Sequence, residues 1–441
     1  MGGIGVLGLL IALVVLVVLV FRGYHVLPVT LLASLIVFLT NRFEIWPGFM
    51  EGYAPAMTGF IASYLMMFLF GSLVGELLSK SGAASSIAYQ FAETFGAKRA
   101  LLIVVLSSII LSYGGVSVFV IIFSIYPIAL VLFQQADIPK RVIPGAIMLG
   151  AGSFTMTTLP GTPALTNIVP TKYLGTTTTA APMIGIISAI VMFAVGYAIF
   201  TMYVKKLKVD GEKFVLGEND SAIGLVEEEM QDLPPFALSL LPILVIIGTI
   251  LGVRFSGIEI DSVYSVVIAL FLGSVVAYAL FYKRLGSPKP SLRIASEGSL
   301  GAIMNTSSVV GFGGAIRLVP AFQQFVAFAT GLSFHPLISA ALAVNIIAGI
   351  TGSSTAGITI FMDSMAQDFL SMGVEPQVLH RIGSMAAGVL DSLPHAGPNV
   401  TFLMVTGLSF KEGYPGIFLA TCVVPLVGLI TALTLAFLGI V

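Results

Sequence analysis

The chain has 441 residues, of which 57% are hydrophobic and only 9% are charged. Because a soluble protein carries about 25% charged residues, this composition excludes a soluble protein with an ordinary polar surface and favours a polytopic α-helical membrane protein. The formal net charge of −1 gives no reason to expect a nucleic-acid partner. The apolar runs are continuous rather than alternating, which argues against a membrane β-barrel.

Apolar runs form two groups, separated by one long hydrophilic stretch. The first group covers 4–21, 25–41, 56–78, 100–134, 142–169 and 181–204. The second group covers 235–252, 262–282, 298–318, 336–371, 377–406 and 415–440. The stretch from Lys205 to Asp232 contains the charged sequences KKLK, GEND and EEE, and we expect a cytoplasmic linker over 205–233.

Polar, helix-breaking sequence interrupts several of these runs. Residues 157–167, TTLPGTPALTN, combine two prolines and a glycine with hydroxyl and amide side chains, and residues 391–401, DSLPHAGPNVT, repeat the pattern. Shorter polar breaks, LSYGGVS at 111–117 and GITGSST at 349–355, precede them. Proline disrupts a helix, and non-helical backbone at membrane depth is tolerated only where protein or water covers it. We therefore expect the four breaks to surround a ligand.

The order of these segments indicates an internal duplication. The breaks at 157–167 and 391–401 are offset by 234 residues, and the same offset relates FAETFGAKRALLI at 91–103 to FVAFATGLSFHPLI at 325–338. The two shorter breaks fall in the same order. Three matches in one order favour a repeat over chance similarity between apolar segments.

Basic residues predict how the two halves cross the membrane. If LSYGGVS and GITGSST are the tips of re-entrant hairpins and the N-terminus lies outside, 15 of the 20 Lys and Arg residues fall inside, and five, Arg381 among them, fall outside. The positive-inside rule favours this arrangement, which inverts the second half relative to the first and leaves both termini outside.

We therefore expect an all-α polytopic membrane protein built from two inverted-topology repeats, each with a re-entrant hairpin and a broken transmembrane helix. Such repeats are typical of secondary transporters. The first repeat is expected over 1–204, with its hairpin at about 98–135 and its broken helix at about 141–170. The second is expected over 234–441, with its hairpin at about 335–371 and its broken helix at about 376–406.

Hydroxyl, amide and glycine residues accompany the breaks and are the candidate substrate ligands. Hydroxyls and amides hydrogen-bond a polyol or a carboxylate, and glycine lets a ligand approach the backbone. The candidates are Ser112, Gly114, Gly115, Ser117, Thr157, Thr158, Gly161, Thr162, Gly352, Ser353, Ser354, Thr355 and Asn399. A structural alternative stays open for each, because serine and threonine in membrane helices often bond their own i−4 carbonyls and small residues often serve packing.

Ionisable residues inside membrane segments are costly and usually functional. Asp391 and His395 are the best such pair, and together with Asn167 they are the candidate ion-coupling residues. The options for Asp391 are to carry a proton, to ligate a cation, or to cap the half-helix that starts beside it. No resident metal or cofactor is expected, although Na+ at the helix breaks stays open beside H+. His380 is expected at a helix end or in a loop.

Several segments resemble the gluconate permease family, in order along nearly the whole chain. They are FGSLVGELLSKSGAASSIAYQFAETFGAKRALLIVVL at 70–106, the LSYGGVSVFV hairpin, the TTLPGTPALTNI break, the GITGSSTAGIT hairpin and the DSLPHAGPN break. The resemblance implies an organic-acid symporter of the cytoplasmic (inner) membrane, usually proton-coupled, with a scaffold domain, a transport domain, elevator-type motion and a homodimeric assembly. The sugar-acid permeases of that family carry a glutamate at the first hairpin tip, where Gly114 and Gly115 stand here. The sequence therefore leaves open whether the substrate is gluconate or a smaller carboxylate.

The sequence thus predicts a symporter of a small organic acid with H+ or Na+, whose partners are that anion, the ion and membrane lipid. The alternative is an anion channel or a facilitator without ion coupling, although a channel requires a continuous pore. An enzyme is not expected, because the sequence contains no G-x-S-x-G and no H-E-x-x-H.

Overall fold

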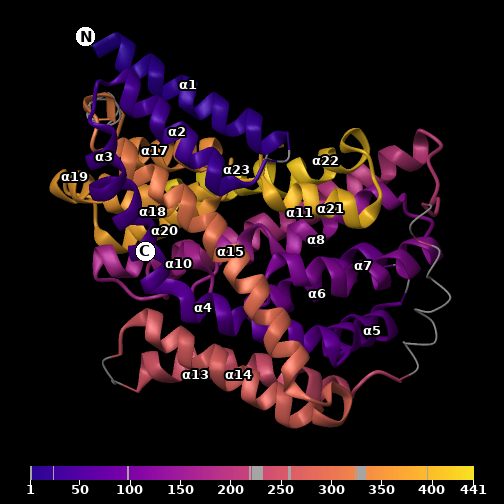
Figure 1. Ribbon diagram of the computed structural model, residues 1–441. Helices are drawn as coiled ribbons and strands as arrows, with labels where there is room; N and C mark the ends of the chain where they lie inside the picture. The colour runs from indigo at the N-terminus through magenta and orange to yellow at the C-terminus, as the bar shows by residue number, and fades with distance from the viewer. Residues whose placement is uncertain are drawn as a thin grey trace.

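The computed structural model describes residues 2–22, 24–96, 99–217, 220, 232–256, 260–322, 324, 334–394 and 396–441. Within these residues the chain is helical and contains no strand (Figure 1), which confirms the expected all-α class. The helices before the linker are α1 (Gly2–Phe21), α2 (Val26–Thr40), α3 (Ile45–Pro47), η1 (Gly48–Tyr53), α4 (Ala54–Lys80), α5 (Ala83–Phe95), α6 (Ala100–Tyr113), α7 (Val118–Gln135), η3 (Lys140–Val142), α8 (Ile143–Ala151), α9 (Phe154–Thr157), α10 (Leu165–Leu174) and α11 (Pro182–Val209).

The second half of the chain, after the linker, is also helical up to the C-terminus. They are α13 (Phe236–Phe255), α14 (Ser262–Leu285), α15 (Pro288–Arg317), α17 (Pro336–Thr351), α18 (Ser354–Ser364), α19 (Ala366–Ser371), α20 (Pro376–Ala387), α21 (Gly397–Thr406), α22 (Phe410–Phe418), η6 (Leu419–Val423) and α23 (Val424–Phe437).

Among the described residues, five helical stretches are long and apolar enough to cross a membrane. They are Ile45–Lys80, Pro182–Val209, Phe236–Val253, Val263–Leu285 and Phe410–Phe437. Shorter apolar helices lie at Ile4–Leu16, Val26–Thr40, Ala100–Tyr113 and Pro336–Gly349. A multi-pass membrane protein follows from these lengths.

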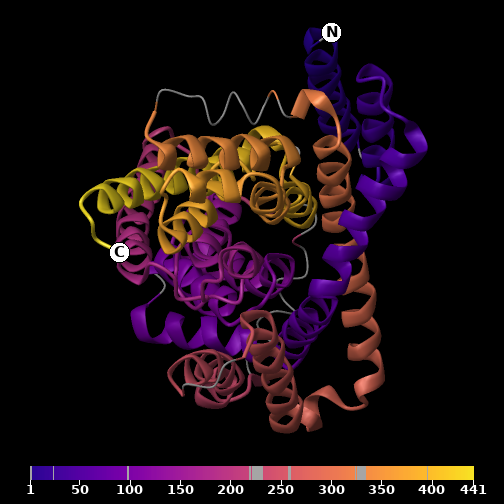
Figure 2. The ribbon, with the colours of Figure 1, turned by 90° about the vertical axis from the view of Figure 1, so that its left-hand side faces the viewer.

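Helices α1, α2, α4, α14 and α15 form a layer along one side of the molecule, which we call the helical wall (Figure 2). Its central pair, α4 and α15, packs through small residues. A methyl group on Gly314 would lie 2.4 Å from Ala56 Cβ and 2.5 Å from the carbonyl oxygen of Gly52. Close contact of this kind favours helix association where lipid removes the hydrophobic driving force.

Helices α6 to α11 and α17 to α23 form a second body beside the wall, which we call the helical bundle (Figures 1 and 2). Helices α5 and α13 contact each other, and α5 also packs on α6 and α7 while α13 packs on α14, so they join the two bodies. A small separate apolar core lies within the wall around Phe38 and Phe312. The larger core fills the bundle and reaches α4.

The two shorter polar breaks are tight turns between packed helices. Helix α6 ends at Tyr113 and α7 begins at Val118, with Gly115 in the turn at φ +83°. Helix α17 ends at Thr351 and α18 begins at Ser354, with Gly352 in the turn at φ +60°. Glycine adopts positive φ without the steric cost that other residues pay, so these two residues allow the chain to reverse inside an apolar sequence.

Each of the two longer breaks is a non-helical stretch between two helices. In the first, α8 and α9 are followed by the non-helical residues 158–164 before α10 begins. In the second, α20 ends at Ala387 and α21 begins at Gly397. The non-helical residues of the first interruption include Pro160 and Pro163, and those of the second include Pro394.

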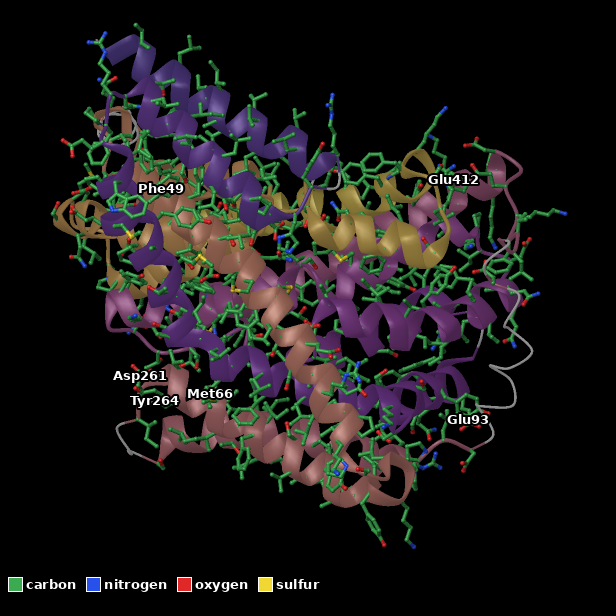
Figure 3. The ribbon with its side chains drawn as sticks, viewed as in Figure 1. Phe49, Met66, Glu93, Asp261, Tyr264 and Glu412 are labelled. Carbon is green, nitrogen blue, oxygen red and sulfur yellow. The ribbon has the colours of Figure 1, made fainter. Side chains whose placement is uncertain are left out.

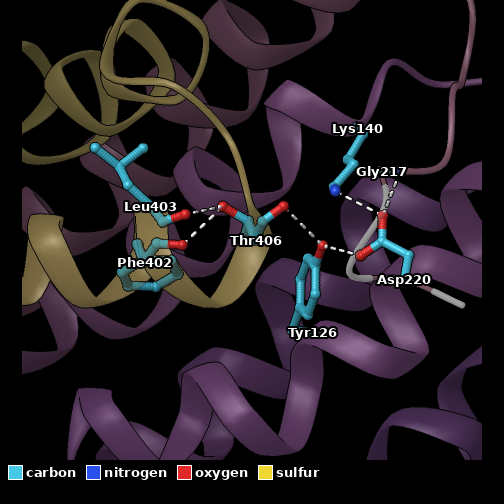
Figure 4. Close-up of polar contacts among 7 residues, drawn as sticks. All are labelled: Tyr126, Lys140, Gly217, Asp220, Phe402, Leu403 and Thr406. Atoms are coloured by element: carbon cyan, nitrogen blue, oxygen red, sulfur yellow. Dashed lines mark hydrogen bonds and ion pairs between the residues drawn. The ribbon is translucent and has the colours of Figure 1, made fainter. Parts of the chain in front are cut away.

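The expected linker begins within a helix and contains a buried residue. Helix α11 continues to Val209, and Asp220 is buried. The Asp220 carboxylate lies 2.6 Å from Lys140 Nζ and accepts hydrogen bonds from Tyr126 (2.8 Å) and from the N–H of Gly217 (2.7 Å), as Figure 4 shows. Tyr126 also lies 3.3 Å from the carbonyl oxygen of Thr406, so this cluster joins α7, η3 and α21 to the linker.

Different parts of the chain lie on the left and right sides of the molecule in Figure 1. Both chain termini lie on the left of Figure 1, whereas the end of α11 and the described residues after it lie on the right. In Figure 3, Asp261 lies on the side of the termini, and Glu93 and Glu412 lie on the opposite side. Both termini therefore share one face, and the linker starts at the other.

Candidate functional site

The first hairpin meets the first helix break. Tyr113, at the end of α6, donates a hydrogen bond of 2.8 Å to the carbonyl oxygen of Pro160. Ser112 donates one of 3.0 Å to the carbonyl oxygen of Ala151, at the end of α8. A methyl group on Gly115 would lie 3.3 Å from Pro163 Cγ. The carbonyls that the break releases from the helix ladder therefore find partners on the hairpin tip, as buried backbone requires.

The second hairpin meets the second helix break in the same manner. Asp391 interacts with the hydroxyl and the backbone of Ser354, at the first turn of α18. Its carboxylate also accepts a hydrogen bond of 3.0 Å from Ser392. A methyl group on Gly349 would lie 3.0 Å from Leu390 Cβ. A carboxylate at the N-terminus of α18 is favourably placed for the partial positive charge there.

The two breaks also touch each other. A methyl group on Gly388 would lie only 2.6 Å from Thr157 Cγ2, so these two segments are in direct contact. Helix α10 packs on α18, and α21 packs on α7, so the second half of each broken helix packs against the hairpin of the other half of the chain. One polar centre therefore forms where the hairpin tips and breaks converge.

Arg381 is a charged residue beside the first break. The charge count assigns it to the outer side of the membrane, and its side chain is 0% exposed within the protein. Its guanidinium donates to Asn167 Oδ1 (3.0 Å), to the carbonyl oxygen of Ala180 (2.8 and 3.1 Å) and to that of Thr178 (3.3 Å). Among the residues that the structure describes, no carboxylate lies within ion-pair distance of it. The charge is therefore satisfied by neutral oxygens alone.

His380 is also buried, where the sequence analysis expected a loop or helix-end residue. Its Nε2 lies 3.2 Å from Asn167 Oδ1, and its Nδ1 lies 2.7 Å from Thr176 Oγ1. Asn167 Oδ1 accepts from Arg381, because guanidinium N–H groups only donate. The His380 Nε2 therefore donates to the same oxygen, and Nδ1 accepts from Thr176. A neutral imidazole fits both contacts.

The predicted threonines of the first break are buried, and their hydroxyls differ in how they are satisfied. Thr157 donates to the carbonyl oxygen of Ser153 (3.1 Å), its i−4 residue, and lies 3.2 Å from the hydroxyl of Thr158. Thr162 Oγ1 is buried without a hydrogen-bond partner in the described part of the chain. Gly161, at φ +79°, lies against the hydroxyl of Tyr113.

Asn167 and Asn399 hold the loops of their own breaks. Asn167 donates to the carbonyl oxygens of Thr162 (3.0 Å) and Thr178 (2.8 Å). Asn399 donates to those of Ser392 (2.9 Å) and Leu393 (3.0 Å). The Asn399 Oδ1 atom is buried and has no partner among the described residues. It leaves an acceptor that a bound ligand can satisfy.

The other predicted residues lie at the hairpin tips or outside the described chain. Ser353 caps α18 through a hydrogen bond of 3.3 Å from the N–H of Ala356. Thr355 is partly buried in the first turn of α18, Gly114 is buried, and Ser117 is exposed at the start of α7. His395 lies outside the residues that the structure describes.

A cavity of about 700 Å³ opens beside the first break. Its walls include Pro160, Thr176, Thr177, Leu251 and Gln377. Thr176 is also the partner of His380, so the cavity reaches the network around Arg381. A solute can therefore approach the polar centre from this side, whose lining mixes hydroxyl and amide groups with apolar ones, as small-molecule sites do.

Sequence reasoning missed Arg381 and Tyr113. One signal pointed to Arg381, because a charge within an apolar helix that starts with proline has to be explained. Nothing local marks Tyr113, whose partner lies 47 residues further along the chain.

An all-helical chain with several membrane-spanning helices and interrupted helices around a buried polar centre has the architecture of a multi-pass membrane transporter. The model of the GntP family permeases matches residues 4–437, and the chain belongs to this family. It is 34% identical over 440 residues to the transporter YxjC of Bacillus subtilis (strain 168), with 91% of this chain and 93% of that protein covered. The family and its relatives are transporters, so the chain is a permease and not an enzyme.

Two further comparisons agree with this assignment. A transporter of Haemophilus influenzae (strain ATCC 51907 / DSM 11121 / KW20 / Rd) is 28% identical over 352 residues, with 79% of this chain and 77% of that protein covered. Among solved structures, the YdaH transporter of Alcanivorax borkumensis is similar with a TM-score of 0.55 and 14% identity, over 87% of this chain and 88% of that one. At this identity the likeness concerns the fold alone.

Proposed function

We propose that the chain is a secondary active symporter of a small organic acid, such as gluconate or a related carboxylate, coupled to H+ or Na+. The observation that carries the proposal is the convergence of two hairpin tips and two helix breaks on one polar centre. A carboxylate group, Asp391, lies in the second break beside Ser354. A guanidinium group, Arg381, binds Asn167 beside the first break. Half-helix ends and unwound backbone at such a point are the means by which transporters bind substrates and ions.

The proposed substrate ligands are the residues that the sequence analysis named. Thr162 and Asn399 are the strongest candidates, because each has a buried oxygen that no described residue satisfies. Asp391 is the proposed coupling residue, since it lies at the junction of hairpin and break. Hydroxyl and amide ligands suit a hydroxylated carboxylate, and the buried guanidinium favours an anion.

The pattern of helix contacts supports the proposed inverted repeats. Helix α6 packs on α8 as α17 packs on α20, and α7 packs on α21 as α18 packs on α10. Hairpin and broken helix thus have equivalent relations in both halves. We extend this to membrane topology: both hairpins re-enter, both termini lie outside, and the linker is cytoplasmic, in the inner membrane.

Elevator-type motion is the proposed mechanism, with the bundle moving against the wall. The polar centre lies within the bundle. Between the wall and the bundle lies a cavity of about 270 Å³, which is lined in part by Lys172, Arg317 and Asp363. A homodimer, in which two walls pack together, is the proposed assembly. An interface partly lined by polar groups suits sliding better than a continuous apolar seam.

Counterflow in proteoliposomes tests the proposed function. Vesicles containing purified protein and loaded with unlabelled gluconate or lactate should transiently concentrate the labelled acid, and the rate should saturate. A carrier gives this result because one site alternates between the two sides. Uptake that rises linearly with concentration and shows no transient concentration would instead identify a channel.

A further inference from the structure

Residues 175–181 join α10 to α11, and we call them the strap. Arg381 of α20 donates to two strap carbonyls, those of Thr178 (3.3 Å) and Ala180 (2.8 and 3.1 Å). Beside Ala180, the backbone of Ala181 has φ +42°, which is unfavourable for a residue other than glycine. A strained conformation of this kind persists only where the surrounding structure holds it. Arg381 therefore fixes a segment that is strained at its end.

The carbonyl oxygen of Thr178 also binds the first helix break. It accepts from the N–H of Gly161 (2.9 Å) and from the amide nitrogen of Asn167 (2.8 Å), in addition to Arg381. Gly161 lies within the non-helical residues 158–164, so its N–H has no partner in a helix ladder and requires one elsewhere. One carbonyl group therefore joins the break, the strap and α20.

Asn167 connects Arg381 to the break through an amide group whose orientation is fixed. A guanidinium group only donates, so the amide oxygen of Asn167 faces Arg381 at 3.0 Å. The amide nitrogen therefore faces the other way, where it donates to the carbonyl oxygens of Thr162 (3.0 Å) and Thr178. Thr162 carries a buried hydroxyl that no described residue satisfies. The guanidinium thus sets the position of a proposed substrate ligand through one intervening side chain.

The guanidinium group itself is occupied by these contacts. Four of its five N–H groups are donated to the strap and to Asn167, and the side chain is 0% exposed. The cavity of about 700 Å³ beside the first break is lined by Thr176 and Thr177 of the strap, whereas Arg381 is not among the described residues that line it. A solute in this cavity therefore contacts the strap and not Arg381.

We propose that Arg381 is a positioning residue for the first helix break. It holds the strap and, through Asn167, keeps the unwound backbone around Thr162 in its ligand-binding conformation before the substrate arrives. This inference rests on the proposed function, which assigns the break to the substrate site. A site formed in advance avoids the entropy cost of ordering on binding, so the contribution of Arg381 appears in KM. Because α20 leads into the second break, the shape of the first break also depends on the second half of the chain.

Hydrogen exchange of the substrate-free protein in detergent micelles tests the positioning role without any transport. We expect the amide hydrogens of 158–164 to be protected in the wild type. Arg381→Lys keeps the charge but cannot reach all the acceptors at once, and it should raise the exchange rate of this segment at least about ten-fold. Ser384→Ala is the matched control, since it removes a different hydrogen bond of α20, to the carbonyl oxygen of Thr166, and should leave this exchange unchanged.

Counterflow of gluconate or lactate in proteoliposomes measures the consequence for binding. Arg381→Lys should raise KM at least about ten-fold and keep the maximal rate per folded protein within about three-fold, whereas a general structural defect lowers the maximal rate. His380→Phe removes the contacts of a buried ring with Thr176 and Asn167. It should raise KM about three-fold and keeps the test available if Arg381→Lys does not fold. Ser384→Ala should change neither parameter.

The two measurements separate the inference from the proposed function. A raised KM in Arg381→Lys with unchanged exchange of the substrate-free protein would identify Arg381 as a direct substrate ligand and overturn the inference. Rapid exchange of 158–164 in the wild type, or wild-type KM and exchange in both Arg381→Lys and His380→Phe, would also overturn it. A wild-type protein without saturable counterflow of either acid refutes the proposed function, while the exchange measurement needs no substrate and decides the positioning role by itself.

Discussion

The contact between the two helix breaks gives a direct test of the site, because a single methyl group can separate them. In Gly388→Ala the new carbon would lie 2.6 Å from Thr157 Cγ2 and 3.3 Å from Thr157 Oγ1. Carbon atoms pack best at about 3.5–4.0 Å, so one segment has to move by roughly 1 Å. Overpacking of this kind costs about 1–3 kcal/mol. We expect counterflow of gluconate or lactate to fall at least about ten-fold.

A second substitution should reverse the effect. Thr157→Ser removes Cγ2, the atom in the closest contact, and should restore at least about half of the lost activity when combined with Gly388→Ala. Gly252→Ala is the matched control, because a methyl group there meets nothing within 4 Å, and its counterflow should equal that of the wild type. Wild-type activity in Gly388→Ala, or no recovery in the double variant, would show that the two breaks do not meet as described.

Three further predictions concern single contacts. Tyr113→Phe removes the hydrogen bond from the first hairpin tip to the first break, and we expect about 1 kcal/mol of lost stability and a KM raised about five-fold, measured by unfolding in mixed micelles and by counterflow; an unchanged KM would refute the role of this contact. Asp220→Asn leaves Lys140 buried with a neutral partner in place of the carboxylate and should destabilise the protein by about 3–5 kcal/mol, whereas the Lys140→Met/Asp220→Leu double variant should recover most of that loss. In contrast, Arg317→Gln breaks a half-exposed pair with Asp363 and should cost no more than about 1 kcal/mol, so a loss comparable to that of Asp220→Asn would contradict the burial assigned to the two pairs.

The class of fold and the positions of the breaks were predictable because their signals are local. Apolar runs of fixed length predict helices that span a membrane. The proline and glycine residues around Pro160 and at Gly115 and Gly352 predict where a helix cannot continue. The turns and interruptions of the structure fall at these residues.

The surroundings of Arg381 were not predictable, because they come from distant sequence. Its hydrogen-bond acceptors belong to Asn167 and to the carbonyls of Thr178 and Ala180, more than 200 residues away along the chain. Asp220 is a similar case, since a carboxylate in a hydrophilic stretch gives no sign that it pairs with Lys140, 80 residues earlier. Whether a charge is buried depends on tertiary packing, so the residues next to it in the sequence do not reveal it.

The internal repeat was only partly predictable from the sequence. The offset of 234 residues predicted equivalent segments, and the equivalent contacts of α7 with α21 and of α18 with α10 support them. The sequence did not show that the second half of each broken helix packs against the hairpin of the other half. That exchange is the reason why both breaks contribute to one centre rather than to two.

Proton movement driven by the substrate tests the central claim most directly. Proteoliposomes that contain a pH-sensitive dye receive an inward gradient of gluconate or lactate, with no initial pH difference. For coupling to H+ we predict acidification of the lumen that saturates with substrate concentration, is retained in Ser384→Ala and is lost in Asp391→Asn. Saturable uptake of the acid that neither acidifies the lumen nor requires Na+, or acidification that survives in Asp391→Asn, would contradict the proposed symport.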